Sequence, residues 1–164
     1  MGINPLYPTV DSIASSWADI IVRATPADAP MIDLSAIKSI KRSRTVELGE
    51  QRVGGRVVKR TTGSVKLELS MTLYRDGWID LLAKLALIAP ARGNQKAISL
   101  VHFGIQVQHT PIGDARIYEW RAKGVRILGD ALDASEGNDA DSVDVPLSVI
   151  EIVDMVGSKE VVML

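Results

Sequence analysis

The sequence contains no cysteine, and only 4% of its 164 residues are aromatic. The lack of cysteine excludes disulfide frameworks, thiolate zinc sites and cysteine nucleophiles. It also fits a protein that is assembled in a reducing cytoplasm. Because aromatic residues are so few, valine, isoleucine and leucine must fill most of the core.

A surplus of either charge is missing as well, since 19 basic and 20 acidic residues give a formal net charge of -1. Proteins that bind nucleic acid through its phosphates usually carry a basic surplus. We therefore do not expect a dedicated DNA- or RNA-binding protein. The longest apolar stretch, residues 81–91, is shorter than the roughly 20 residues that span a bilayer. Residues 1–16 show no secretory signal, so we expect a soluble protein without a membrane partner.

The length fits one domain, and the 46% of apolar residues can build a real core. Residues 1–16 carry Pro5 and Pro8 and are expected to form an extended N-terminal arm. Residues 17–164 are expected to form a single domain.

A strict alternation of apolar and polar residues runs through residues 65–74 and predicts a strand with one buried face. Its apolar positions are Val65, Leu67, Leu69, Met71 and Leu73. Similar patterns predict strands within residues 17–24, 34–46, 101–107 and 118–127, and one long strand over residues 143–152.

Two further features shape the predicted fold. The apolar phase changes near Gly124, which indicates a bulge or bend and assigns Val125 and Ile127 to the other face from Trp120. One helix is predicted over residues 76–89, with Asp76 as its N-cap. Its apolar stripe should pack on the sheet and consists of Trp78, Leu81, Leu82 and Leu85. The predicted fold is mainly β, an antiparallel sandwich or barrel with one packed helix.

Residues 47–60 are polar and rich in glycine, and they predict a long, flexible hairpin loop. Loops of this length inside a compact domain are uncommon and are usually functional or disordered. Gly49 and Gly54 have the spacing of a phosphate-binding loop, but Gly55 and Arg56 stand where that loop needs lysine and a hydroxyl residue.

No other pattern predicts catalysis. His102 and His109 are the only histidines, and their odd spacing places them on opposite faces of a regular strand, which disfavours a shared metal site. The acidic run from Asp130 to Asp144 lacks the ligand pattern of a calcium loop. A solvated turn is favoured there, with a weak ion site as the alternative. We expect no enzyme, no metal and no cofactor.

A basic cluster lies at residues 38–44 and includes Lys38, Lys41, Arg42 and Arg44. No aromatic residues are interleaved with it, as single-strand nucleic-acid binders require. We interpret the cluster as a solvated strand face or as one half of a contact between subunits.

Three sequence features together resemble the phage tail tube proteins, which are related in fold to the tube proteins of secretion systems. The first is Arg60-Thr61-Thr62-Gly63 with the strand SVKLELSMTLY behind it. The second is Asp76-Gly77-Trp78 at the start of a leucine-rich helix. The third is Gly129-Asp130, an acidic spacer and then Asp144-Val145-Pro146-Leu147-Ser148-Val149.

The resemblance implies a subunit that joins copies of itself into hexameric rings, whose inner sheets merge into a continuous barrel. Stacked rings would form a tube through which phage DNA passes without specific binding. The implied partners are a tape-measure protein, tail-completion proteins and, in a contractile tail, a sheath protein. The implied location is the virion tail, after assembly in the host cytoplasm.

Within that framework, the loop at residues 47–60 is the predicted contact between rings, because a long hairpin can reach the adjacent ring. The residues expected in this contact are Gly49, Arg52, Gly54, Gly55, Arg56, Lys59 and Arg60. Their acidic partners are predicted in the 130–144 stretch, at Asp133, Glu136, Asp139 and Asp141.

Two other functions stay open. The chain could be a tube component of a contractile injection or secretion system, which has the same architecture. It could also be a monomeric small-molecule-binding β-barrel, or an enzyme built on one, and would then need a polar-lined pocket.

Overall fold

The computed structural model describes residues 9–10, 13–14, 20–27, 29–34, 36–61, 63–109, 117–133 and 141–162. Most of the chain within these ranges is strand, with one α-helix and a short 3-10 turn, and the predicted fold class is confirmed. The first elements are β1 (Thr9–Val10), β2 (Ile13–Ala14), β3 (Ile20–Pro26), β4 (Ile32–Asp33), β5 (Ile37–Val46), β6 (Gly49–Val53), β7 (Arg56–Thr61) and β8 (Val65–Tyr74). They are followed by α1 (Arg75–Ile88), β9 (Ala91–Arg92), β10 (Gln95–Lys96), η2 (Ile98–Leu100), β11 (Phe103–His109), β12 (Tyr118–Ile127), β13 (Ala131–Asp133), β14 (Ser142–Ser148), β15 (Glu151–Val156) and β16 (Lys159–Val162).

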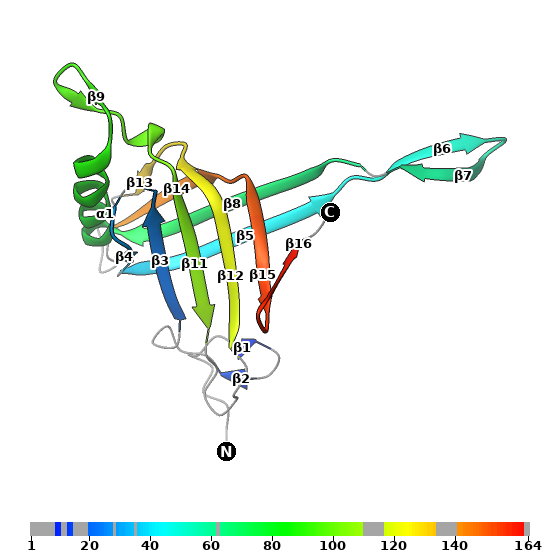
Figure 1. Ribbon diagram of the computed structural model, residues 1–164, viewed down its shortest axis with the longest axis horizontal. Helices are drawn as coiled ribbons and strands as arrows, with labels where there is room; N and C mark the ends of the chain where they lie inside the picture. Colours follow the sequence, from blue (N-terminus) through cyan, green and yellow to red (C-terminus); the bar gives the residue numbers. More distant parts are fainter. Residues whose placement is uncertain are drawn as a thin grey trace.

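Two antiparallel sheets form the body of the molecule. The first sheet has the order β4-β3-β11-β12-β15-β16, and the second has the order β5-β8-β14-β13. Strand β12 belongs to both, since residues 119–123 pair with β15 while Arg126 and Ile127 pair with β14. Figure 1 shows the strands of the two sheets crossing at a steep angle, so that their inner faces enclose one core.

The core is built from the alternating apolar residues of both sheets. In β8 the predicted alternation is confirmed, because Leu69, Met71 and Leu73 are buried while Lys66 and Glu68 are exposed. Strand β11 buries its apolar positions in the same way. Helix α1 lies at one end of the sandwich (Figure 1), and its buried side chains belong to the same core.

The bulge predicted near Gly124 is present. Phe103 pairs with Val125 whereas Ile105 pairs with Ala122, so β12 holds one extra residue between these pairs. Gly124 has φ +66°, a conformation that favours glycine. The assignment of Val125 to the other face is wrong, because the extra residue returns the later part of β12 to the core.

Two predicted boundaries are also wrong. The helix begins at Arg75 with Tyr74 as its N-cap, and no side chain caps it. Asp76 instead lies in the first turn, where a carboxylate favours the helix dipole. The long strand predicted over residues 143–152 is two strands, β14 and β15, because the chain turns between them and passes from the second sheet to the first.

The proposed N-terminal arm at residues 1–16 lies outside the described residues except for β1 and β2, which pair with each other. Its boundary with the domain stays a prediction. Within the described ranges, no helix has both the length and the apolar character needed to cross a bilayer.

Candidate assembly interface

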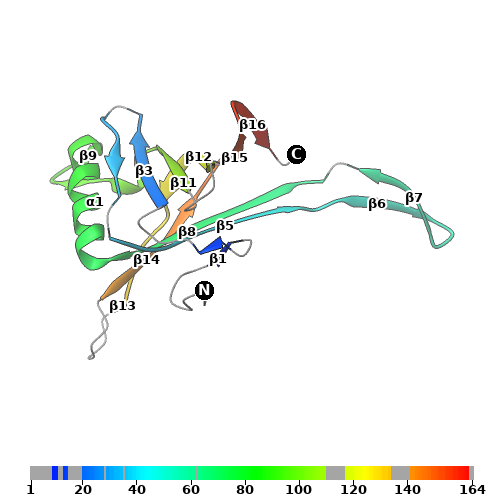
Figure 2. The same ribbon diagram turned by 90° about the horizontal axis from the view of Figure 1, so that it is seen from below.

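The segment predicted as a flexible loop is a two-stranded hairpin whose register shifts by one residue between Gln51 and Arg52. Strand β6 pairs with β7 from Gly49 opposite Thr61 to Val53 opposite Arg56. Gly54 and Gly55 form the turn with φ +60° and +80°, as a two-residue hairpin turn requires. Figures 1 and 2 both show this projecting hairpin (residues 49–61) extending beyond the ends of β5 and β8, clear of the sandwich.

A glycine at the base of the projecting hairpin holds its two strands close together. The backbone N–H of Glu47 donates to the carbonyl of Ser64 at 2.9 Å. A Cβ added at Gly63 would lie 1.0 Å from the carbonyl oxygen of Glu47. Any side chain at position 63 would therefore push the two strands apart and change the direction in which the hairpin leaves the body.

The projecting hairpin exposes apolar side chains to solvent. Every residue from 47 to 61 is exposed, and Val58 reaches 65%. Leu48, Val53 and Val57 are the other large apolar side chains at this end of the molecule. An isolated two-stranded ribbon is marginally stable in water, and its open edges and valines can pair with another chain. The hairpin thus stands to gain stability when a partner covers it.

The four predicted contact cations of the projecting hairpin fall into two pairs. Arg52 and Arg60 both approach Glu50 of the same hairpin, at 3.0 and 3.8 Å. Arg56 and Lys59 have no ion-pair partner among the residues that the structure describes. The hairpin therefore keeps part of its positive charge available for another molecule.

Only two of the four predicted acidic partners, Asp133 and Asp141, lie within the described residues. Asp141 lies 3.6 Å from Arg75 at the start of α1, and Asp133 is the last residue of β13. Glu136 and Asp139 lie outside the described residues. Figures 1 and 2 place β13 and the projecting hairpin at opposite ends of the molecule. A contact between them therefore needs a second copy of the chain, and the pairing stays a prediction.

An ion cluster that sequence reasoning missed joins the two sheets. Asp154 of β15 forms ion pairs with both Arg42 and Arg44 of β5, with 2.7 Å between Arg42 Nη1 and Asp154 Oδ1. The guanidinium of Arg42 stacks 4.9 Å from the centre of the Trp120 ring. Tyr118 also donates to Asp154, at 3.2 Å. The interpretation of Arg42 and Arg44 as a solvated face is wrong, because they point inward and clamp the sandwich.

The electrostatics of this cluster hold Asp154 in its charged form. Burial by itself would raise the pKa of the Asp154 carboxyl, but the hydrogen bonds from Arg44 and Arg42 outweigh it and lower that pKa. Burial raises the pKa of Tyr118, so its phenol stays protonated at neutral pH and can donate to Asp154. The cluster is thus a structural clamp at neutral pH.

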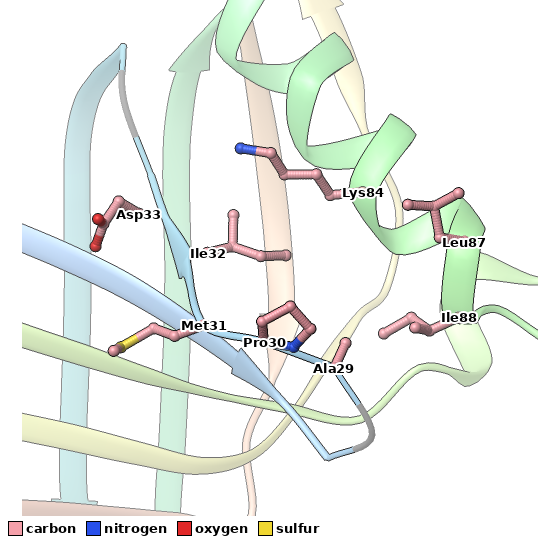
Figure 3. Close-up of a pocket in the computed structure, with 8 residues that line it drawn as sticks. All are labelled: Ala29, Pro30, Met31, Ile32, Asp33, Lys84, Leu87 and Ile88. Atoms are coloured by element: carbon pink, nitrogen blue, oxygen red, sulfur yellow. The ribbon is translucent and has the colours of Figure 1, made fainter.

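Helix α1 and residues 29–33, which include β4, border an open pocket of about 510 Å³ (Figure 3). Of the helix positions predicted to pack on the sheet, Trp78, Leu81 and Leu85 are buried and Leu82 is partly buried. The pocket walls are mainly apolar, and Leu87 at the rim is 83% exposed.

The two charged residues of the pocket are already paired. Asp33 binds Arg23 at 2.9 Å and Lys84 binds Asp80 at 2.8 Å. The pocket therefore lacks the converging polar groups that orient a small ligand.

The two histidines do not form a metal site in the described part of the chain. His102 is exposed and His109 is partly buried, and among the described residues no three metal-binding side chains lie close together.

No family model matches the sequence, and no curated protein matches it. Solved structures do match. A chain of the anti-feeding prophage baseplate, determined with sixfold symmetry, has a TM-score of 0.62 and 12% identity, over 90% of this chain and 97% of that one. The fold is that of injection-system tube proteins. The predicted resemblance to tail tube proteins is confirmed at the level of the fold.

Two further structures carry this tube-protein fold. A chain of the sheath–tube complex of an extracellular contractile injection system has a TM-score of 0.56 and 12% identity, over 83% of this chain and 87% of that one. The Hcp1 protein from E. coli EAEC 042 has a TM-score of 0.53 and 9% identity, over 88% and 96% of the two chains. At identities this low, the structural likeness establishes a shared fold and nothing about function. The function has to be argued from the surface of this chain.

Proposed function

We propose that this protein is a structural subunit that assembles with copies of itself into hexameric rings, which stack into the tube of a phage tail. The observation that carries the proposal is the projecting hairpin, which exposes valines and open strand edges and lies clear of the rest of the chain that the structure describes. Assembly would bury this surface on the adjacent ring. The tube-protein fold supports the same conclusion.

In this proposal the subunit catalyses nothing, and its activity is the polymer itself. The tube conducts phage DNA without binding it specifically, which fits the net charge of -1. Its other partners in the virion tail are tape-measure and tail-completion proteins, together with a sheath protein in a contractile tail. Assembly takes place in the host cytoplasm.

A second candidate, the tube of a contractile injection system, is favoured by one observation. Several solved structures with this fold come from such systems, one of them a sheath–tube complex. The physical task of the subunit is the same in both cases. Isolated particles would separate the two, because a phage tail joins a DNA-filled head and an injection system does not.

The decisive experiment replaces residues 49–62 with Asn-Gly, so that Leu48 and Gly63 flank a two-residue turn and Val46 stays opposite Val65. The shortened subunit should keep its circular dichroism spectrum and cooperative unfolding, because the projecting hairpin adds nothing to the core. It should form no tubes in negative-stain electron microscopy.

A matched control changes exposed apolar surface at the opposite end of the molecule. Leu87→Ser removes a side chain that is 83% exposed on α1 and should leave tube formation intact. Tubes of normal length from the shortened subunit would refute the role of the projecting hairpin. A wild-type chain that elutes only near its own mass of 17.7 kDa at every concentration would refute the proposed function.

A further inference from the structure

Between the body and the projecting hairpin, β5 and β8 continue as a two-stranded ribbon. Residues 69–74 of β8 pair with β14, whereas among the described residues 65–68 pair only with residues 43–46 of β5. We call residues 43–46 and 65–68 the connecting ribbon, which Figures 1 and 2 show leading from the body to the hairpin. A two-stranded ribbon is only marginally stable alone. Side-chain contacts with the body therefore have to fix its direction.

Apolar packing weakens along the connecting ribbon. On the core face of β8, Leu69 is buried, but Leu67 and Val65 are only partly buried. The β5 residues opposite Leu69 and Leu67 are Arg42 and Arg44 instead of apolar side chains. Hydrophobic contacts are non-directional, and few of them remain here. The body therefore holds this part of the molecule mainly through the two arginines.

The clamp of Arg42, Arg44 and Asp154 attaches β5 to the first sheet at two points. Both arginines form ion pairs with Asp154 of β15. Arg44 also donates to the carbonyl of Ile152 at 3.4 Å, and the guanidinium of Arg42 stacks on the Trp120 ring. A strand that is attached at one point can still tilt about that point. Two attachments, two residues apart along β5, fix its angle to the first sheet.

The surface that receives the arginines is held firmly in the first sheet. Strand β15 pairs with β12 at five residue pairs, with Asp154 opposite Trp120. The side chains of Arg42, Arg44 and Asp154 are 19%, 14% and 18% exposed, so salt and water screen their charges only weakly. Hydrogen bonds between charged groups are short and directional. Such ion pairs can select one arrangement of the elements that they join without adding net stability.

A small change of angle at the clamp becomes a large displacement at the tip of the projecting hairpin. The chain from Arg44 to the turn at Gly54 is extended, and these ten residues span about 33 Å. A tilt of about 10° would move the turn by roughly 6 Å, which exceeds the spacing of about 4.8 Å between neighbouring strands. A hairpin tilted this far would miss its place on an adjacent copy.

We propose that Arg42, Arg44 and Asp154 are positioning residues for assembly, because together they set the direction in which the projecting hairpin leaves the body. The inference rests on the proposed function and adds a condition that this chain's own residues must meet. A subunit without the clamp keeps its sandwich and its hairpin. It presents the hairpin over a range of angles, so fewer copies meet in the geometry that assembly needs.

The direction of the hairpin can be measured on separate copies, because the chain has no native cysteine. Spin labels on Gln51→Cys in β6 and Thr25→Cys in β3, two exposed positions, report the distance between the hairpin and the body. Pulsed electron paramagnetic resonance of dilute protein should give a narrow distance distribution for this labelled parent. Adding Asp154→Asn or Arg44→Met should shift or broaden the distribution by roughly 4 Å, since seven residues of extended chain lead from Arg44 to Gln51.

The same two variants without labels test assembly, and both should reduce the yield of tubes in negative-stain electron microscopy several-fold. Arg44→Met leaves Asp154 paired with Arg42, so it should fold even if Asp154→Asn does not. The matched control is Leu85→Ala, which removes a buried side chain of α1 and leaves the clamp intact. At temperatures where it is folded, this control should keep the parental distance distribution and the wild-type tube yield.

Unchanged distances in the clamp variants would overturn the inference and leave the proposed function standing. Equal broadening in Leu85→Ala would do the same, because the effect would then follow from lost stability. Broadened distances with a wild-type yield of tubes would also overturn it, since assembly would not depend on the direction of the hairpin. A wild-type chain that forms no tubes would refute the proposed function instead, while the distances still decide whether the clamp sets that direction.

Discussion

The sandwich body and the projecting hairpin are both made of antiparallel strand pairs, yet they are stabilised differently. In the body, strands such as β8 bury one face against the opposite sheet. In the hairpin, β6 and β7 bury neither face. The body therefore owes its stability to packing within one chain, whereas the hairpin relies on its glycine turn and on contacts that another copy would supply.

The largest expected effect contrasts one side chain in each region. Leu85→Ala removes a side chain of α1 that is fully buried, and should lower the free energy of unfolding by about 2–5 kcal/mol. Val58→Ala in the projecting hairpin should change it by less than about 0.5 kcal/mol but should reduce tube yield. Urea denaturation and electron microscopy measure the two quantities. Equal destabilisation by both variants would show that the hairpin belongs to the folding unit.

A smaller effect is expected from the clamp between the sheets. Asp154→Asn leaves Arg42 and Arg44 without their carboxylate and should lower the free energy of unfolding at pH 7 by about 1–3 kcal/mol. Because the folded-state pKa of Asp154 lies below its ordinary value of 3.8, this contribution is present above that value. It is lost as the pH falls through the folded pKa. The difference between wild type and variant should therefore shrink on acidification.

The control for the clamp is Glu68→Gln on the exposed face of β8, where the carboxylate is exposed and its partner Lys66 is exposed as well. This variant should leave urea denaturation at pH 7 nearly unchanged. A stability difference for Asp154→Asn that did not shrink on acidification would mean that the arginines do not act through the charge of Asp154.

The smallest expected effect compares one substitution in both regions. Gly124 and Gly54 have φ +66° and +60°, so alanine is strained at either position, by roughly 1–2 kcal/mol. At Gly124 the new Cβ would also lie 2.5 Å from Cδ1 of Ile150, whereas at Gly54 it meets nothing within 4 Å. Only Gly124→Ala should lower the midpoint of urea unfolding followed by the fluorescence of the buried Trp78 and Trp120.

The added substitution Ile150→Ala should recover part of the loss in Gly124→Ala, because it removes the contacting side chain. A midpoint that falls equally for Gly54→Ala would mean that strain in the hairpin turn reaches the body. In that case the two regions would unfold as one unit.

Much of the fold could be predicted from residues that are close in sequence. The alternation in β8, the phase change at Gly124 and the helical stripe of α1 can each be recognised from apolar residues only a few positions apart. The position of the projecting hairpin was found in the same way, from its polar, glycine-rich residues. Its strand pairing was missed, because Val53 and Val57 are too few to produce a visible period.

The errors arose where local patterns compete with long-range contacts. Apolar residues alternate from Val143 to Val149, and the phase then slips at Ile150. A bulge within one strand gives the same pattern as a turn between two strands, so the turn between β14 and β15 was missed. The N-cap was assigned to Asp76 because aspartate is a preferred N-cap residue. The helix instead starts directly at the end of β8, without a side-chain cap.

The sequence by itself determined the mainly β fold, its helix, its bulge and the place of the hairpin, because these follow from the periodicity of near neighbours. Only the tertiary structure decided that Arg42 and Arg44 meet Asp154, and that the hairpin projects away from the body. It also decided which strand edges stay open. Such features depend on how two sheets cross and on which residues far apart in sequence then share a face, and no local pattern encodes that geometry.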